Sequence, residues 1–173
     1  MQAAQVARME VSPLSGICTA GTYRGPWRGA IRAFKYEGQR RLAGALAALM
    51  PALPDGRHPT LIVPVPLYPD RLKWRGYNQS DLLAAALGER LGLVVATDAL
   101  RRVRDTRPQV GLSAAARRRN MRGAFAAQSA QVSGREILLV DDVLTTGATL
   151  AACAEALLQA GAGTVRAVTL AHA

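Results

Sequence analysis

The chain of 173 residues has few cysteines and histidines, which excludes several classes of site. Cys18 and Cys153 lie far apart in the sequence and outside any C-x-x-C pair, and neither His58 nor His172 sits at ligand spacing from them. A disulfide framework or a four-ligand zinc site cannot be built from so few residues. We interpret both cysteines as small, partly buried apolar residues in a reducing compartment.

Long apolar runs are also missing. Every apolar stretch is broken by Arg, Gly or Pro well before the roughly 20 residues that a membrane helix needs. The first residues lack the basic start and continuous apolar segment of a signal peptide. A hydrophobic fraction of 50% still supplies material for a core, and the length suits one compact domain. The sequence predicts a soluble, cytoplasmic protein without a membrane span.

Acidic residues are scarce relative to basic ones, and the net charge is +10. Residues 101–122 hold eight arginines against one aspartate, a net charge of +7, and Arg71, Lys73 and Arg75 form a second basic cluster. The planar guanidinium group donates hydrogen bonds in pairs to phosphate oxygens. The two clusters together favour a polyphosphate or nucleic-acid partner over a merely solvated face, which would suffice for one short run.

The order of apolar segments predicts an α/β fold. Strands that alternate with helices form a parallel sheet with right-handed crossovers. Asn78 is placed to cap a helix that ends at Gly92. The expected helices cover about 27–36, 39–50, 79–92 and 147–161, and the expected strands 60–67, 93–100, 123–128, 136–142 and 164–173.

The stretch ILLVDDVLTTGAT, residues 137–149, places two adjacent carboxylates where an apolar strand ends. Ligands bind at the carboxyl ends of parallel strands, so Asp141 and Asp142 are candidate binding residues. The loop that follows leads directly into a helix, whose first N–H groups and nearby hydroxyls form an anion site. The members of this cradle are Thr145, Thr146, Gly147, Ala148 and Thr149.

Carboxylates above a phosphate cradle indicate a particular ligand. Asp141 and Asp142 can accept hydrogen bonds from vicinal hydroxyls or help to hold a magnesium ion, directly or indirectly. Ribose 5-phosphate presents that combination, with a phosphate at one end and a cis-diol at the other. The alternative is an aspartate pair that only caps the next helix, and the whole thirteen-residue arrangement disfavours it. The sequence therefore predicts a ribose 5-phosphate site with Mg²⁺.

This stretch resembles, position for position, the motif that binds phosphoribosyl pyrophosphate (PRPP) in type I phosphoribosyltransferases. The segments 23–47, 63–84 and 101–125 resemble the ComF family of competence and DNA-utilisation proteins, which are related to GntX. The likeness runs from about Ala20 to the last residue. It implies a type I phosphoribosyltransferase-like parallel sheet flanked by helices. An N-terminal extension and small helical hood would cover residues 1–58, and the core 59–173.

Members of the ComF family usually begin with a four-cysteine zinc module, which this sequence lacks. The sequence begins about where such a module would end. Truncation, a misassigned start and natural loss are the three explanations that we consider.

The resemblance also implies a pyrophosphate-binding loop after the first core strand. Nearby basic side chains suit the charge of pyrophosphate. The motif R-G-x-N-Q is a family signature, and within it Asn78 is either a helix cap or a ligand contact. The implied pyrophosphate residues are Val65, Pro66, Leu67, Arg71, Lys73 and Arg75.

The arginine-rich segment occupies the place of the superfamily's mobile active-site loop. Such a loop could close over pyrophosphate and exclude water. The alternative is a surface that grips a nucleic-acid backbone. The residues that match the family pattern here are Arg104, Thr106, Gln109, Arg117 and Asn120.

Two classes of function share the expected pocket. An enzyme would transfer the phosphoribosyl group and release pyrophosphate, with arginines and Mg²⁺ stabilising the departing group. No residue of the sequence must be its general base. A non-catalytic accessory protein would bind a nucleotide or single-stranded DNA within a DNA-uptake or recombination complex. The acceptor of an enzymatic transfer has no signature in the sequence.

Overall fold

The computed structural model describes residues 7–9, 11–51, 59–106 and 114–173. Its strands are β1 (Ala7–Met9), β2 (Ile17–Thr22), β3 (Leu61–Pro64), β4 (Leu100–Arg102), β5 (Phe125–Ala127), β6 (Glu136–Leu144) and β7 (Thr164–His172). Its helices are α1 (Gly25–Tyr36), α2 (Leu42–Leu49), α3 (Pro69–Arg75), α4 (Gln79–Leu91), α5 (Ala114–Met121), α6 (Ser129–Val132) and α7 (Ala148–Gln159). None of the described helices is long and apolar enough to cross a membrane.

The main sheet has five strands in the order β1-β2-β7-β6-β3. Pairing is parallel throughout, except that β1 runs antiparallel to β2. The predicted α/β fold with a parallel sheet is thus confirmed. The boundary between 1–58 and 59–173 stays a prediction, although β1 and β2 precede it and lie in the same sheet as β7.

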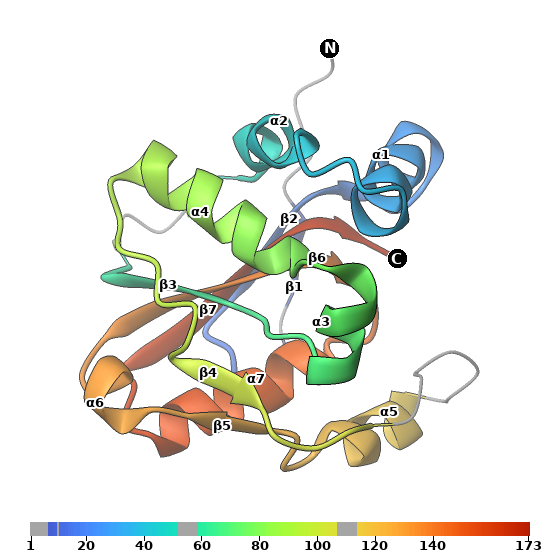
Figure 1. Cartoon of the computed structure of the whole chain (residues 1–173). Coiled ribbons are helices and arrows are strands. Elements are labelled where there is room, and N and C mark those ends of the chain that lie inside the picture. The colour runs from blue at the N-terminus through green and yellow to red at the C-terminus, as the bar shows by residue number, and fades with distance from the viewer. Residues whose placement is uncertain (1–6, 10, 52–58, 107–113) are drawn as a thin grey trace.

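Two apolar layers sandwich the sheet, because side chains alternate along each strand. Along β6, Ile137 and Leu139 face one layer and Leu138 and Val140 the other, and all four are almost fully buried. The hood helices α1 and α2 and helix α4 cover one face, whereas α7 and the β4–β5 pair cover the other (Figure 1).

The predicted strand at 93–100 is largely wrong. Val95 forms only an isolated bridge with Ile62 of β3, and β4 begins at Leu100. Val94 is 69% exposed, so the apolar run that suggested a strand does not pack into the sheet there. The predicted strand at 123–128 exists as β5, but it pairs with β4 outside the main sheet. Helices 27–36, 39–50, 79–92 and 147–161 are confirmed as α1, α2, α4 and α7.

The binding edge of the sheet is created by an early end of β3. Its pairing with β6 stops at Pro64 and Val140, and Val65 N donates the last hydrogen bond to Val140 O at 2.9 Å. The residue after Val65 is a proline, which has no N–H to continue a ladder. Since β6 continues beside β7 as far as Leu144, its other edge has no strand partner beyond Val140 among the described residues.

Candidate functional site

Asp142 connects the sheet to the hood. It lies within β6, and its Oδ1 is 2.9 Å from Nζ of Lys35 on α1, with 4% of the aspartate side chain and 18% of the lysine side chain exposed. Oδ2 of Asp142 is buried and has no hydrogen-bond partner in the described part of the chain. Burial lowers the pKa of Lys35, but the attraction and hydrogen bond of Asp142, together with Asp141 and Tyr36, outweigh it and leave that pKa raised. The contact between the two side chains therefore joins β6 to α1.

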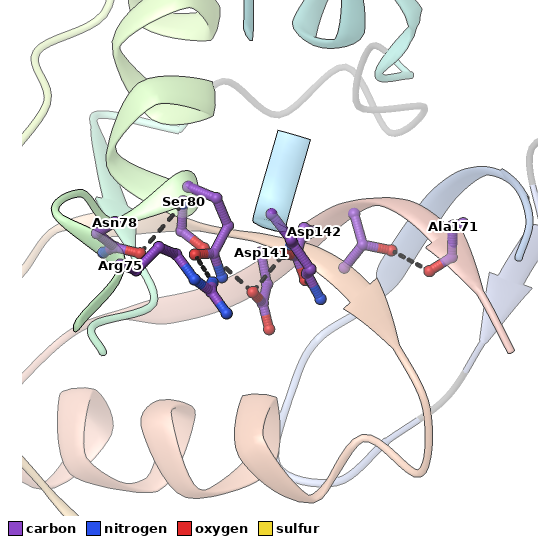
Figure 2. A network of polar contacts seen from close by, with 9 residues as sticks. Arg75, Asn78, Ser80, Asp141, Asp142 and Ala171 are labelled. Atoms are coloured by element: carbon purple, nitrogen blue, oxygen red, sulfur yellow. Dashed lines mark hydrogen bonds and ion pairs between the residues drawn. The ribbon is translucent and has the colours of Figure 1, made fainter. Parts of the chain in front are cut away.

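Asp141 lies at the free edge of β6, on the side that β3 has left. It accepts hydrogen bonds from Ser80 Oγ at 3.1 Å and from the backbone N–H of Asp142 at 2.9 Å (Figure 2). Burial raises the pKa of Asp141 to about 7, with a further rise from Asp142, whereas Lys35 and the two hydrogen bonds oppose the shift. The charge of this carboxyl group consequently changes near neutral pH.

A raised pKa in the folded state makes stability depend on pH. Because the ordinary value is 3.8 and the folded value about 7, the folded protein binds the proton more tightly than the unfolded chain does. The stability from this group is full below its ordinary pKa and is lost as pH rises through 7. We expect the free energy of unfolding to fall over that window, and Asp141→Asn to flatten the fall, as measured by urea unfolding at several pH values.

Burial raises the pKa of Asp81 to about 6, and a hydrogen bond from Asn78 opposes that rise. Asp81 therefore also lowers the free energy of unfolding as pH rises, and this contribution persists in Asp141→Asn. Glu89→Gln, at an exposed carboxylate on α4, is the control and should keep the wild-type slope. A slope that Asp141→Asn leaves unchanged would contradict the assignment.

The loop after β6 has the backbone of an anion site. Gly147 adopts a φ of 75°, and a Cβ there would lie 2.9 Å from the Val11 side chain, so only glycine fits. Helix α7 begins at Ala148 and has no acidic residue in its first turn, so no such side chain neutralises its positive end. The hydroxyl of Thr146 is buried and without a hydrogen-bond partner among the described residues.

Asn78 anchors the loop that follows β3. Its Oδ1 accepts from Ser80 N at 3.2 Å, which caps α4, and its Nδ2 donates to Val65 O at 3.1 Å and to Asp81 Oδ1 at 2.7 Å. The structure therefore places Asn78 as a helix cap. The same side chain fixes the first carbonyl of the predicted pyrophosphate loop, and through Ser80 the capped helix also reaches Asp141.

Helix α3, which follows the loop after β3, carries three basic side chains that differ in how firmly they are held. Arg71 and Lys73 are exposed on α3, whereas Arg75 is partly buried, donates to Gln79 and lies 5.2 Å from the centre of the Tyr36 ring. Burial lowers the pKa of Arg102 on β4, and repulsion from Arg71 adds to the decrease while Asp141 opposes it. The β4 strand therefore lies within electrostatic reach of the site.

The predicted mobile-loop residues are only partly described. Arg104 donates to the backbone oxygens of Asn120 at 2.9 Å and Arg122 at 2.7 Å, which satisfies carbonyls at the end of α5. Thr106 is buried and accepts a hydrogen bond from Arg102. Gln109 lies outside the described residues, as does the side chain of Arg117. Closure of this segment over a ligand stays a prediction.

Sequence reasoning did not identify Lys35, Ser80 or Arg102 as individual contributors. Ser80 follows the cap residue directly, and that position could have indicated it. Lys35 carried no local signal, because its partner Asp142 lies on a distant segment.

The donor set fits a magnesium ion that arrives with its ligand. Among the described residues, no group of three or more His, Cys, Asp or Glu could hold a metal by itself. Asp142 is already paired with Lys35, which leaves Asp141 as the more available carboxylate. Mg²⁺ is commonly held by one or two carboxylates together with substrate phosphates, and Asp141 could supply such a carboxylate.

Comparison with known proteins assigns the chain to a family. The phosphoribosyl transferase domain family matches residues 83–173, more than half of the chain. Sequence identity is 37% over 163 residues with the DNA utilization protein YhgH of Escherichia coli O157:H7, covering 89% of this chain and 70% of that protein. The chain belongs to the ComF family. The predicted family is thus confirmed.

A second relative agrees with this ComF-family assignment, and one solved structure agrees with the fold. Competence protein F of Haemophilus influenzae is 37% identical over 162 residues, covering 88% of this chain and 71% of that protein. The fold resembles that of the glutamine phosphoribosylpyrophosphate amidotransferase from B. subtilis complexed with ADP and GMP, with a TM-score of 0.51 and 19% identity. That match covers 80% of this chain and 30% of the amidotransferase, and it shows the fold alone.

Proposed function

We propose that this ComF-family chain binds PRPP, or a nucleotide that contains ribose 5-phosphate, together with Mg²⁺. The observation that carries the proposal is the Thr146 hydroxyl, which is buried and without a partner in the described part of the chain at the start of α7. A buried polar group without a partner costs free energy, which a phosphate oxygen accepting its hydrogen bond would offset. The positive end of α7 favours the same phosphate.

The sugar end of the ligand would meet Asp141. This carboxyl group is held by Ser80 and by the backbone of Asp142, so its position is set before a ligand arrives. Its remaining lone pairs can accept from the two ribose hydroxyls. Asp142 itself faces Lys35, and we assign it the role of holding β6 against the hood.

The pyrophosphate end would meet the loop after β3, whose Val65 carbonyl is fixed by Asn78. Arg71 and Lys73 extend from α3 beside this loop and supply positive charge. Mg²⁺ bound with the ligand would neutralise charge on the pyrophosphate oxygens. In the transferase form of the proposal, these groups stabilise pyrophosphate as it leaves.

Calorimetric titration with PRPP and Mg²⁺ tests the proposal. We expect Asp141→Asn and Thr146→Val each to weaken PRPP binding by about tenfold, because each variant loses one hydrogen bond to a charged or hydroxyl group of the ligand. The matched controls are Thr97→Val and Asp98→Asn, an exposed pair before β4, which should bind PRPP as the wild type does. If all four variants bind PRPP as tightly as the wild type does, the proposal is refuted. Pyrophosphate release during incubation with a panel of bases would distinguish transfer from binding.

Single-stranded DNA is a second candidate ligand, favoured by one observation. Trp74 on α3 is 74% exposed and lies between Lys73 and Arg75 in the sequence, a pattern suited to base stacking beside phosphate contacts. The names of the relatives, DNA utilization protein and competence protein, support the same partner. The same calorimetric titration can be repeated with a single-stranded DNA oligonucleotide. If the oligonucleotide binds Asp141→Asn and Thr146→Val as tightly as it binds the wild type, it uses a surface other than the PRPP site.

A further inference from the structure

We propose that Tyr77 and Arg40 are positioning residues, which fasten the hood to the turn between α3 and α4 and thereby set the pyrophosphate loop. This α3–α4 turn consists of residues 76–78, and Arg40 lies between α1 and α2. Both residues act through the backbone of the turn and through Asn78 rather than by contact with a ligand. Their effect on PRPP binding rests on the proposed function, whereas the fastening itself does not.

The side chain of Tyr77 attaches the α3–α4 turn to the end of α1. Tyr77 is only 8% exposed, and its hydroxyl donates a hydrogen bond to the backbone oxygen of Phe34 in the last turn of α1. The last carbonyls of a helix have no partner within the helix, so this bond satisfies a group that α1 leaves open. The two rings also face each other at a tilt of 50°, with their centroids 6.3 Å apart.

Arg40 makes the reciprocal contact, from the hood to the α3–α4 turn. Its Nη2 donates to Gly76 O at 3.2 Å, and its guanidinium group lies 4.6 Å from the centre of the Tyr77 ring. Gly76 ends α3 with a φ of 77°, and a Cβ there would lie 3.2 Å from Nη2 of Arg40. Glycine thus permits both the left-handed backbone and the close approach of the arginine.

The last turn of α1 holds two sides of the proposed site at once. The Phe34 carbonyl accepts from Tyr77, which fixes the α3–α4 turn. The next residue, Lys35, contacts Asp142 at 2.9 Å, which fixes β6. Because adjacent residues of one helix make both contacts, α1 sets how the α3–α4 turn lies relative to β6.

Asn78 transmits the position of the turn to the site. It follows Tyr77 directly, and its Nδ2 donates to Val65 O at 3.1 Å. Its Oδ1 accepts from Ser80 N at 3.2 Å, and the Ser80 hydroxyl donates to Asp141 at 3.1 Å (Figure 2). A displaced turn would therefore move a carbonyl of the pyrophosphate loop and the carboxyl group that we propose binds ribose.

Amide hydrogen exchange followed by NMR measures the fastening without a ligand. The Ser80 amide reports on the turn, because it donates to the Asn78 side chain, and the Ile62 amide of β3, which donates to Val94 O at 2.9 Å, reports on the rest of the fold. We expect Arg40→Met/Tyr77→Phe to raise the exchange rate at Ser80 about tenfold more than that at Ile62. Tyr77→Phe alone keeps the ring and should give part of this increase.

Arg90→Met is the matched control. Arg90 is also an exposed arginine that donates to hood carbonyls, Ala48 O at 3.3 Å and Met50 O at 3.0 Å, but it lies at the opposite end of α4 from Asn78. This variant should change the two exchange rates to the same extent. In calorimetric titration, the double variant should bind PRPP about tenfold more weakly than the wild type, and Arg90→Met should bind it as the wild type does.

The possible outcomes separate this proposal from the proposed function. Exchange at Ser80 that rises no more than exchange at Ile62 would overturn the fastening. If the wild type binds PRPP and the double variant binds it equally well, the two residues do not position the site and the proposal is wrong. If the wild type does not bind PRPP, only the proposed function fails, and the exchange rates still decide whether the hood holds the turn.

Discussion

Replacing Lys35 with methionine is expected to lower the free energy of unfolding by about 3 kcal/mol, because it leaves a buried carboxylate without its counter-ion. Only 4% of the Asp142 side chain is exposed, and its Oδ2 already lacks a partner among the described residues. The Lys35 ammonium group at 2.9 Å is thus the main compensation for burying that charge. Urea unfolding followed by circular dichroism measures the loss.

A double-mutant cycle distinguishes this cause from a general effect on α1. The variant Lys35→Met/Asp142→Leu removes both charges, and we expect it to be more stable than Lys35→Met alone. Lys73→Met, at an exposed lysine of α3, should change stability little. If the loss of stability in the double variant equals the sum of the losses in Lys35→Met and Asp142→Leu, the two side chains are not energetically coupled. The loss in Lys35→Met would then not come from an unpaired carboxylate.

Substitution of Asn78 by alanine should cost about 2–4 kcal/mol, the sum of a lost helix cap and of an unsatisfied buried carbonyl. The cap is the bond from Ser80 N to Asn78 Oδ1, and the carbonyl is that of Val65, which accepts from Nδ2. Asn78→Ser retains an oxygen that can accept from Ser80 N, but its side chain is shorter and lacks the second polar group that donates to Val65 O. It should therefore regain part of the stability, while PRPP binding stays weakened because the loop is no longer fixed.

Thermal unfolding and PRPP titration of the two variants are the measurements. Stability of Asn78→Ala equal to the wild type would show that neither bond matters. Full PRPP affinity in Asn78→Ser would show that the loop keeps its position without the anchor.

The elements that were predictable are those whose pattern is local. The strand around Ile137 and the helix after Gly147 are apolar runs with distinct starts and stops, and the family motif spans both. Asn78 and Gly92 mark the ends of α4 in the sequence, and the structure confirms both as caps. These signals depend on residues within one or two turns of each other, which a sequence displays directly.

The elements that the sequence did not predict depend on contacts between distant segments. Strand β2, ICTAGT, has small residues and little alternation, and it becomes a strand because it lies beside β7. The two aspartates were expected where β6 ends, but β6 extends past them because β7 continues to pair with it. Only the departure of β3 after Pro64 opens the edge at Asp141. Which neighbour a strand keeps or loses is not encoded near the strand itself.

The position of β7 has a consequence for how the protein is made. This strand follows every other strand in the sequence, yet it lies between β2 and β6 in the middle of the sheet. On a ribosome the pairs β1–β2 and β3–β6 would emerge first and remain unjoined, each with an unpaired edge, until residues 164–172 leave the exit tunnel. Domains commonly fold as units during translation, and parallel pairing over long separations is slow. The nascent chain is therefore expected to need protection from aggregation until β7 has left the exit tunnel and paired with both neighbours.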